Sequence, residues 1–204
     1  MSKFTTLEQH ASYGIGLQMG QQLADRPFDG LDITAVAAGL AAAYQEQEPE
    51  VTDEQIRAAF MVISERMQAA ESEKSAALAE AGELFLTENA KRAEVTVTAS
   101  GLQYEVLVAA EGTKPTVSDT VRTHYHGTLI DGTVFDSSYQ RGEPAEFPVS
   151  GVIAGWTEAL QLMAVGSKLR LYVPHDLAYG ERGAGNAIAP FSTLVFDVEL
   201  LAIV

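Results

Sequence analysis

Residues that could carry out acid–base or nucleophilic chemistry gather in the second half of the chain. Asp136, Ser137 and Ser138 follow one another. His124 or His175 could supply the base of a hydrolase triad. A hydrolase of that kind holds its serine in a turn flanked by glycines, and no such glycine pattern surrounds either serine. We therefore expect a turn at this position and no triad.

His124 and His126 alternate, so both would lie on the same face of a strand. Two imidazoles can begin a metal site, but no third ligand stands at a useful spacing. The chain has no cysteine, which excludes disulfides, thiol nucleophiles and cysteine-based metal sites. We expect an exposed strand face here, with no metal and no cofactor, and a function performed by shape and electrostatics.

Three glycines near the start of the chain, Gly14, Gly16 and Gly20, superficially resemble a dinucleotide-binding loop. Such a loop follows a strand, whereas these glycines lie inside a predicted helix. Gly16 and Gly20 share one helix face, where two backbones can approach closely. Because glycine lowers intrinsic helicity, packing must compensate. The pattern predicts a tight helix crossing, within or between chains.

The composition is that of a folded protein with a strong acidic excess. The chain has 204 residues, of which 47% are hydrophobic, and its net charge is −15. This charge argues against binding the phosphate backbone of nucleic acids. No apolar run reaches the length of a signal peptide or a membrane span. We expect no nucleic acid, no membrane and, by default, a cytoplasmic protein; a mature periplasmic form would look the same.

Residues 1–93 are predicted to be helical. Capping boxes at residues 6–9 and 52–55 begin helices, and a further helix fits residues 32–44. About forty residues after the second box contain no proline and one glycine, which predicts one long helix. Its later part has few apolar residues and is predicted to be a solvated stalk. Its first part carries an apolar stripe that needs a partner surface: Ile56, Phe60, Ile63 and Met67.

Residues 94–204 change to strand-forming composition. Strands are predicted near residues 96–106, 117–129, 168–173 and 193–204, and one short helix is predicted at residues 156–163. Asp131-Gly132 between two apolar segments predicts a two-residue hairpin turn.

Five motifs in this second half resemble the FKBP family, and they occur in the same order: VRTHYHG at 121–127, DGTVFDSS at 131–138, VIAGW at 152–156, AYG at 178–180 and TLVFDVEL at 193–200. The helical half is similar to the bacterial two-domain branch of that family, which includes the Mip-like dimers and their cytoplasmic relatives. The resemblance implies an α+β protein. Its N-terminal domain would be all-helical and dimeric with a long stalk helix, and its C-terminal domain a twisted antiparallel sheet around a short helix.

The resemblance also implies a proline-binding pocket between sheet and helix. The indole of Trp156 would form its floor, and the Tyr179 hydroxyl and Ile153 amide would bond substrate or drug carbonyls. Departures from the family are Ala145, in place of a common aromatic, and Ala189-Pro190, in place of a proline pair. The implied catalytic residues are Tyr125, Phe135, Asp136, Trp156, Tyr179 and Phe196. The implied substrate-binding residues are Arg141, Phe147, Val152, Ile153 and Ile188.

The implied activity is cis/trans isomerisation of X–Pro bonds in folding proteins, with chaperone-like capture by a dimer formed through residues 1–67. The implied partners are proline-containing unfolded chains and FKBP-directed macrolide inhibitors. Two alternatives stay open: a chaperone or binding module with secondary isomerisation, and a purely structural dimer. Two roles also stay open for Asp136: contact with the twisting imide, or a structural pair with Arg141. Removing residues 1–92 is expected to weaken activity on proteins but not on peptides.

Overall fold

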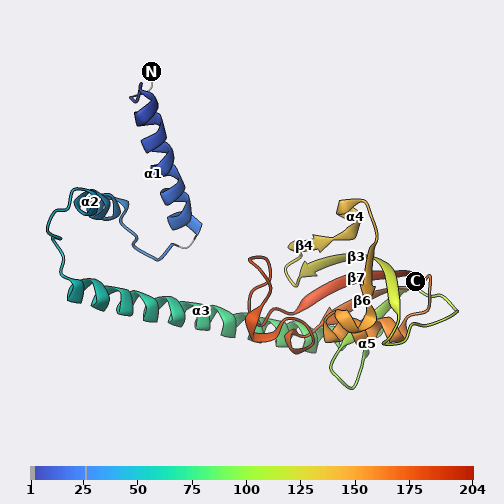
Figure 1. The fold of residues 1–204 in the computed structure, drawn as a ribbon. Coiled ribbons are helices and arrows are strands. Elements are labelled where there is room, and N and C mark those ends of the chain that lie inside the picture. Colours follow the sequence, from blue (N-terminus) through green and yellow to red (C-terminus); the bar gives the residue numbers. More distant parts are fainter. Residues whose placement is uncertain (1–2, 26) are drawn as a thin grey trace. The chain divides into compact units, whose positions relative to one another are not determined.

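The computed structural model describes residues 3–25 and 27–204, which form two compact units that divide between Ala70 and Glu71. The helical unit, up to Ala70, contains α1 (Leu7–Asp25), α2 (Ile33–Tyr44) and the first part of α3 (Asp53–Asn89). The sheet unit, from Glu71, contains the rest of α3 and all the strands (Figure 1).

Local hydrogen bonds explain where the three long helices begin. The N–H of Gln9 donates to Oγ1 of Thr6 at 3.2 Å, and the N–H of Thr6 donates back to Oε1 of Gln9 at 3.2 Å. Thr52 and Gln55 repeat this capping box before α3. Asp32 caps α2 by accepting from the N–H of the residue two positions on, at 2.7 Å. Both predicted capping boxes are thereby confirmed.

The helical unit has no core of its own. None of the described residues between 3 and 70 is buried, and large apolar side chains face solvent. Phe60 is 67% exposed and Tyr13 is 54% exposed. Short helices without tertiary packing are marginal in water. The described residues of this unit therefore do not themselves supply the packing that would stabilise its helices.

The sheet unit is built on one antiparallel sheet in the order β1-β2-β6-β7-β3-β4, with β5 also paired to β3. One face is covered by α5 (Ala154–Leu162), and the core lies between them. The predicted α+β fold, with an antiparallel sheet around a short helix, is confirmed. The strands are β1 (Thr96–Val97), β2 (Gln103–Val108), β3 (Thr120–Leu129), β4 (Val134–Ser137), β5 (Ala145–Pro148), β6 (Lys168–Val173) and β7 (Leu194–Ile203).

Short helical segments complete the connections. They are α4 (Ser138–Arg141) and the 3-10 turns η1 (Val149–Gly151), η2 (His175–Leu177) and η3 (Gly180–Arg182).

The hairpin between β3 and β4 differs from the predicted two-residue turn. The turn expected for two residues, type I′, needs positive φ at both central residues. Gly132 has a φ of 87°, but Asp131 does not have a positive φ. The N–H of Leu129 donates to the carbonyl of Thr133, which closes a three-residue loop. Asp131 instead accepts from the N–H of Thr133 at 2.9 Å. The aspartate side chain therefore stabilises a longer loop with glycine in the left-handed position.

The C-terminal part of α3 packs on the sheet, so the prediction of a solvated stalk is wrong for this part. Ser75, Gly82 and Asn89 are buried, and the ring of Phe85 lies 5.9 Å from that of Tyr172. The fully buried residues of this face are small or polar, and the half-buried apolar residues Leu78, Phe85 and Leu86 lie beside them at helical spacing. The division at residue 70 thus assigns to the sheet unit a segment that the sequence placed with the helices.

A polar network fixes the end of α3. The guanidinium of Arg92 donates to Glu105 at 2.7 Å and to the hydroxyl of Tyr172 at 2.8 Å. The carboxylate of Glu105 is only 7% exposed and also contacts Arg170 at 3.7 Å. Buried carboxylates are stable only with such partners. The segment after α3 is consequently tied to β2 and β6.

Candidate functional site

Trp156 is the centre of the candidate site. It lies in the first turn of α5 and is 4% exposed. Three rings meet its indole edge to face: Tyr125 at 5.3 Å, Phe196 at 5.3 Å and Phe147 at 5.8 Å between centroids. Their interplanar angles are 84°, 81° and 86°, the geometry that aromatic quadrupoles favour. The indole is therefore held from β3, β5 and β7 at once.

Phe135 joins the cluster through Phe196, with centroids 5.4 Å apart and planes at 85°. Both rings lie over Gly127 of β3. A Cβ at Gly127 would come within 2.7 Å of the Phe135 ring and 2.9 Å of the Phe196 ring. The sequence reasoning assigned no role to Gly127, although the residue stands in one of the motifs. Its position directly after His126 in a strand, where glycine is disfavoured, was the available signal.

Asp136, Arg141 and Tyr125 form a polar group beside the aromatic cluster. The hydroxyl of Tyr125 donates to Oδ2 of Asp136 at 2.5 Å and accepts from Nη2 of Arg141 at 2.8 Å. Arg141 also pairs with Oδ1 of Asp136, and its guanidinium lies 5.4 Å from the centroid of the Tyr125 ring. Burial, and then the bond to Asp136, raises the pKa of the Tyr125 phenol above its usual value.

The remaining predicted residues surround this cluster in different ways. Ile188 is buried in the same core, and Val152 and Ile153 are half-buried and pack against it. Ile153 also precedes α5 and accepts from the N–H of Trp156 at 3.0 Å. Tyr179 lies between η2 and η3 and is 41% exposed, which leaves its side chain accessible to a bound molecule.

The residues of the imagined triad have structural partners. Ser138 is completely buried, and its hydroxyl accepts from the N–H of Tyr125 at 2.7 Å. The hydroxyl of Ser137 caps α4 by accepting from the backbone N–H three residues on. His124 does contact Ser138 at 3.0 Å, but Asp136 pairs with Arg141 instead. A buried hydroxyl with these bonds cannot attack a substrate.

The chemistry open to this site is therefore binding and desolvation. The rings packed around Trp156 make the floor of the site largely apolar, and its buried indole Nε1 has no hydrogen-bond partner among the described residues. Within residues 3–25 and 27–204, no group of three metal-ligating side chains occurs. The described helices include none that is long and apolar enough to cross a membrane.

Family models match both parts of the chain. The model described as the domain amino terminal to FKBP-type peptidyl-prolyl isomerase matches residues 8–106. The model described as FKBP-type peptidyl-prolyl cis-trans isomerase matches residues 111–201.

Individual proteins match over nearly the whole chain. The FKBP-type 22 kDa peptidyl-prolyl cis-trans isomerase of Escherichia coli is 55% identical, covering 98% of this chain and 97% of its own. The outer membrane protein MIP of Legionella longbeachae is 41% identical, with coverages of 99% and 88%. The crystal structure of FkpA from Escherichia coli matches with a TM-score of 0.73 at 36% identity and covers 98% of both chains.

Proposed function

The chain belongs to the FKBP-type peptidyl-prolyl cis-trans isomerases, and we propose that it isomerises X–Pro bonds at the aromatic cluster around Trp156. The observation that supports this site is the indole held by three edge-to-face rings, because a rigid apolar surface of that kind fits a proline ring.

The mechanism needs no bond to break. Rotation about an amide bond meets a barrier of about 18–20 kcal/mol, which comes from resonance in the planar form. The two X–Pro isomers differ by only about 0.5–1 kcal/mol, so the enzyme need only bind the twisted amide more tightly than either planar form. The planar amide is the more dipolar one. A water-poor aromatic surface therefore destabilises it relative to the twisted amide.

Individual roles follow from the positions of the side chains. Trp156 supports the proline ring, and Phe135 and Phe196 close the apolar surface beside it. The hydroxyl of Tyr179 and the backbone N–H of Ile153 hold the carbonyls of the peptide. These two polar contacts orient the substrate, while the rings supply the surface on which the amide twists.

The polar group beside the cluster has a supporting role in this proposal. Phe147 packs on the indole of Trp156, and Arg141 bonds to Tyr125 and Asp136. For Asp136 we propose the structural role, because both of its carboxylate oxygens already have partners in the protein. The carboxylate thereby fixes the Tyr125 ring through its hydroxyl.

Two substitutions test the site. Trp156→Leu removes three ring contacts and is expected to lower kcat/KM on an Ala-Leu-Pro-Phe peptide about tenfold or more. Tyr179→Phe is expected to raise KM, because it removes one donor to the substrate. Tyr139→Phe is the matched control, since Tyr139 is similarly exposed, at 42%, but bonds to Glu199. Unchanged isomerisation in both site variants would reject the assignment.

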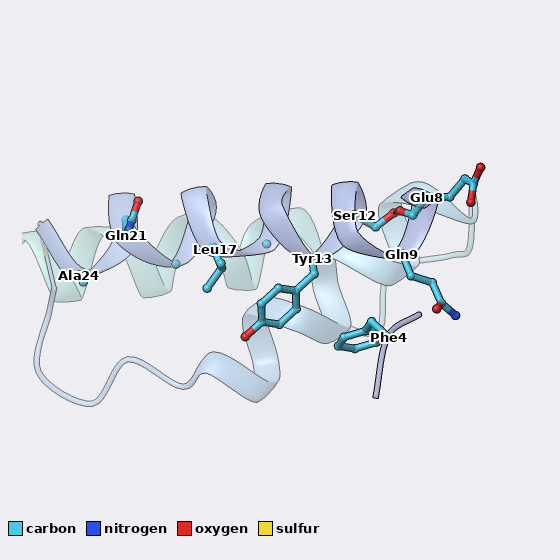
Figure 2. A pocket seen from close by; sticks show the side chains of 10 residues that line it. Phe4, Glu8, Gln9, Ser12, Tyr13, Leu17, Gln21 and Ala24 are labelled. Carbon is cyan, nitrogen blue, oxygen red and sulfur yellow. The ribbon is translucent and has the colours of Figure 1, made fainter. Parts of the chain in front are cut away.

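We further propose that the helical unit joins two copies of the chain. Its apolar side chains are exposed in the single chain, and a cavity of about 780 Å³ lies along one face of α1 (Figure 2). Gly16 and Gly20 line it together with Tyr13 and Leu17, so a second helix could approach closely there. A mass of 21.8 kDa at every concentration in sedimentation equilibrium would refute the dimer.

A dimer would also favour capture of unfolded proteins, because two linked sites raise the effective concentration for one chain. FKBP-directed macrolide inhibitors are expected to bind the same aromatic cluster and to compete with peptide. For the compartment we retain the cytoplasm as the prediction. The relative named an outer membrane protein supports an exported form as the alternative, and fractionation of cells that produce the protein separates the two.

A further inference from the structure

The late loop, residues 180–193, connects the end of the site around Tyr179 to β7. It carries Ile188 into the core cluster of Trp156 and ends directly before the strand of Phe196. The carbonyl of Ile188 accepts from the N–H of Ala184 at 2.8 Å, which closes the loop on itself. A displacement of this loop therefore moves side chains of the proposed site.

Phe191 gives the late loop a strained backbone. Its φ is 59°, in the left-handed region that bulky side chains rarely adopt. Its N–H donates to the carbonyl of Gly180 at 2.9 Å, and its ring meets that of His175 edge-on at 5.1 Å. Such a conformation persists only where the surrounding structure holds it. The shape of the loop thus depends on its neighbours.

α3 supplies one of these neighbours at Gly82. A Cβ at Gly82 would lie 2.4 Å from Oγ1 of Thr193, the last residue of the late loop. Both residues are buried. In Figure 1 the orange-to-red segment that precedes β7 lies beside the C-terminal part of α3. Glycine weakens a helix, and the close approach of Thr193 explains why glycine is nevertheless present in the middle of this packed segment.

We propose that Gly82 is a positioning residue for the proline site: its contact with Thr193 lets α3 hold the late loop in the shape that presents Ile188 and Phe196 to the substrate. This inference rests on the proposed function. It makes the C-terminal part of α3 a component of the catalytic unit, in addition to its connection with the helical unit.

The test uses full-length wild type, Gly82→Ala, Gly82→Ala with Thr193→Ala, and Glu83→Ala. Glu83 is the exposed neighbour of Gly82 and serves as the control. Trp156 is the only tryptophan, so its fluorescence reports on the site alone. The measurements are kcat and KM on the Ala-Leu-Pro-Phe peptide, together with the emission maximum of Trp156.

Gly82→Ala is expected to lower kcat/KM about fivefold, mainly through KM, and to shift the emission, because the added methyl group displaces the loop. Thr193→Ala removes the oxygen that this methyl group would meet, so the double variant recovers most of the activity. Glu83→Ala behaves as wild type. Wild-type values for Gly82→Ala, or a loss that the double variant does not recover, would overturn the proposal.

Two further measurements test the proposal if Gly82→Ala does not fold or if the site itself is wrong. If Gly82→Ala does not fold by circular dichroism, Thr193→Ala alone must raise KM, because it opens a gap between helix and loop; an unchanged KM overturns the proposal. Tyr179→Phe is measured in the same assay. Trp156→Leu is measured as well: if both site variants are unchanged, the site itself is refuted, whereas an affected site variant with a wild-type Gly82→Ala refutes only the role of Gly82.

Discussion

The two units of this chain solve the problem of burying apolar surface in opposite ways. The sheet unit closes a core around Trp156, Leu171 and Val198 within a single chain. The helical unit leaves residues such as Phe60 and Tyr13 exposed. Because apolar burial is the main favourable term in folding, the first unit can be stable alone and the second cannot. The difference is what the proposal of a catalytic sheet unit and an associating helical unit would require.

The same contrast is present along the single helix α3. Its first part carries Phe60 and Met67 toward solvent, whereas its last part buries Ser75, Gly82 and Asn89 on the sheet. Apolar content alone would have predicted a packed first part of α3 and a solvent-exposed last part. Packing on the sheet depends on small side chains and on hydrogen bonds such as the one that the Asn89 amide donates to the side chain at position 103, at 2.9 Å.

The largest expected effect comes from cutting the chain at two positions. Residues 71–204 should fold alone and keep peptide kcat/KM within about twofold, because the core and α3 contacts remain. Residues 94–204 should be less stable by about 3–5 kcal/mol, since Glu105 loses its bond to Arg92. Urea unfolding and peptide assays on both fragments measure this. Equal stability of the two fragments would contradict the assignment of α3 to the sheet unit.

A single charge in the helical unit should have the next largest effect. Phe60→Glu places a carboxylate on the exposed apolar face of α3 and is expected to weaken a dimer at least about 100-fold, because each Phe contributes about 1.5–3 kcal/mol when buried. Peptide isomerisation should not change. Sedimentation equilibrium measures the dissociation, with Glu65→Ala as the exposed control on the same helix. A dimer of wild-type affinity would show that another face mediates association.

Elements with local signals could be predicted from the sequence. The capping boxes at Thr6 and Thr52 mark helix starts through hydrogen bonds between residues three apart. The first four residues of β6 follow the predicted alternation, and its end is buried on both faces. The motifs also identified the residues that meet at Trp156. These contacts come from short segments whose spacing carries the information.

Features that depend on long-range geometry could not be predicted. The docking face of α3 is centred on Ser75, Gly82 and Asn89, which are small or polar, so its few apolar residues, such as Leu78 and Phe85, did not distinguish it from a solvated helix. The hairpin loop was misjudged because the Asp131 side chain stabilises a conformation that the dipeptide alone does not specify. The strain at Phe191 is invisible in sequence, since phenylalanine rarely adopts positive φ.

A smaller effect is expected inside the sheet unit at Gly127. Gly127→Ala would place a methyl group against the rings of Phe135 and Phe196, and overpacking of this kind costs about 1–3 kcal/mol. Both stability and kcat/KM should fall. Thr128→Ala, at the next position of β3, removes atoms instead and serves as the control. A Gly127→Ala protein with the melting temperature and kinetics of wild type would show that the two rings can move without cost.

The smallest expected effect concerns pH and separates the polar group from the aromatic cluster. Burial and the bond to Asp136 raise the pKa of Tyr125, so the protonated phenol is favoured in the folded state. Its contribution to stability is fully present below the ordinary phenol pKa of about 10 and is lost as pH rises through the raised value. Asp136→Ala should bring the Tyr125 pKa closer to 10 and cost about 0.5–1 kcal/mol, while activity survives, because the ring stays packed on Trp156. Tyrosinate absorbance is titrated for wild type and for Asp136→Ala, each with and without Tyr125→Phe. Subtracting the two curves of each pair leaves the titration of Tyr125. Loss of activity in Asp136→Ala at unchanged thermal stability would instead assign the carboxylate to the reacting imide.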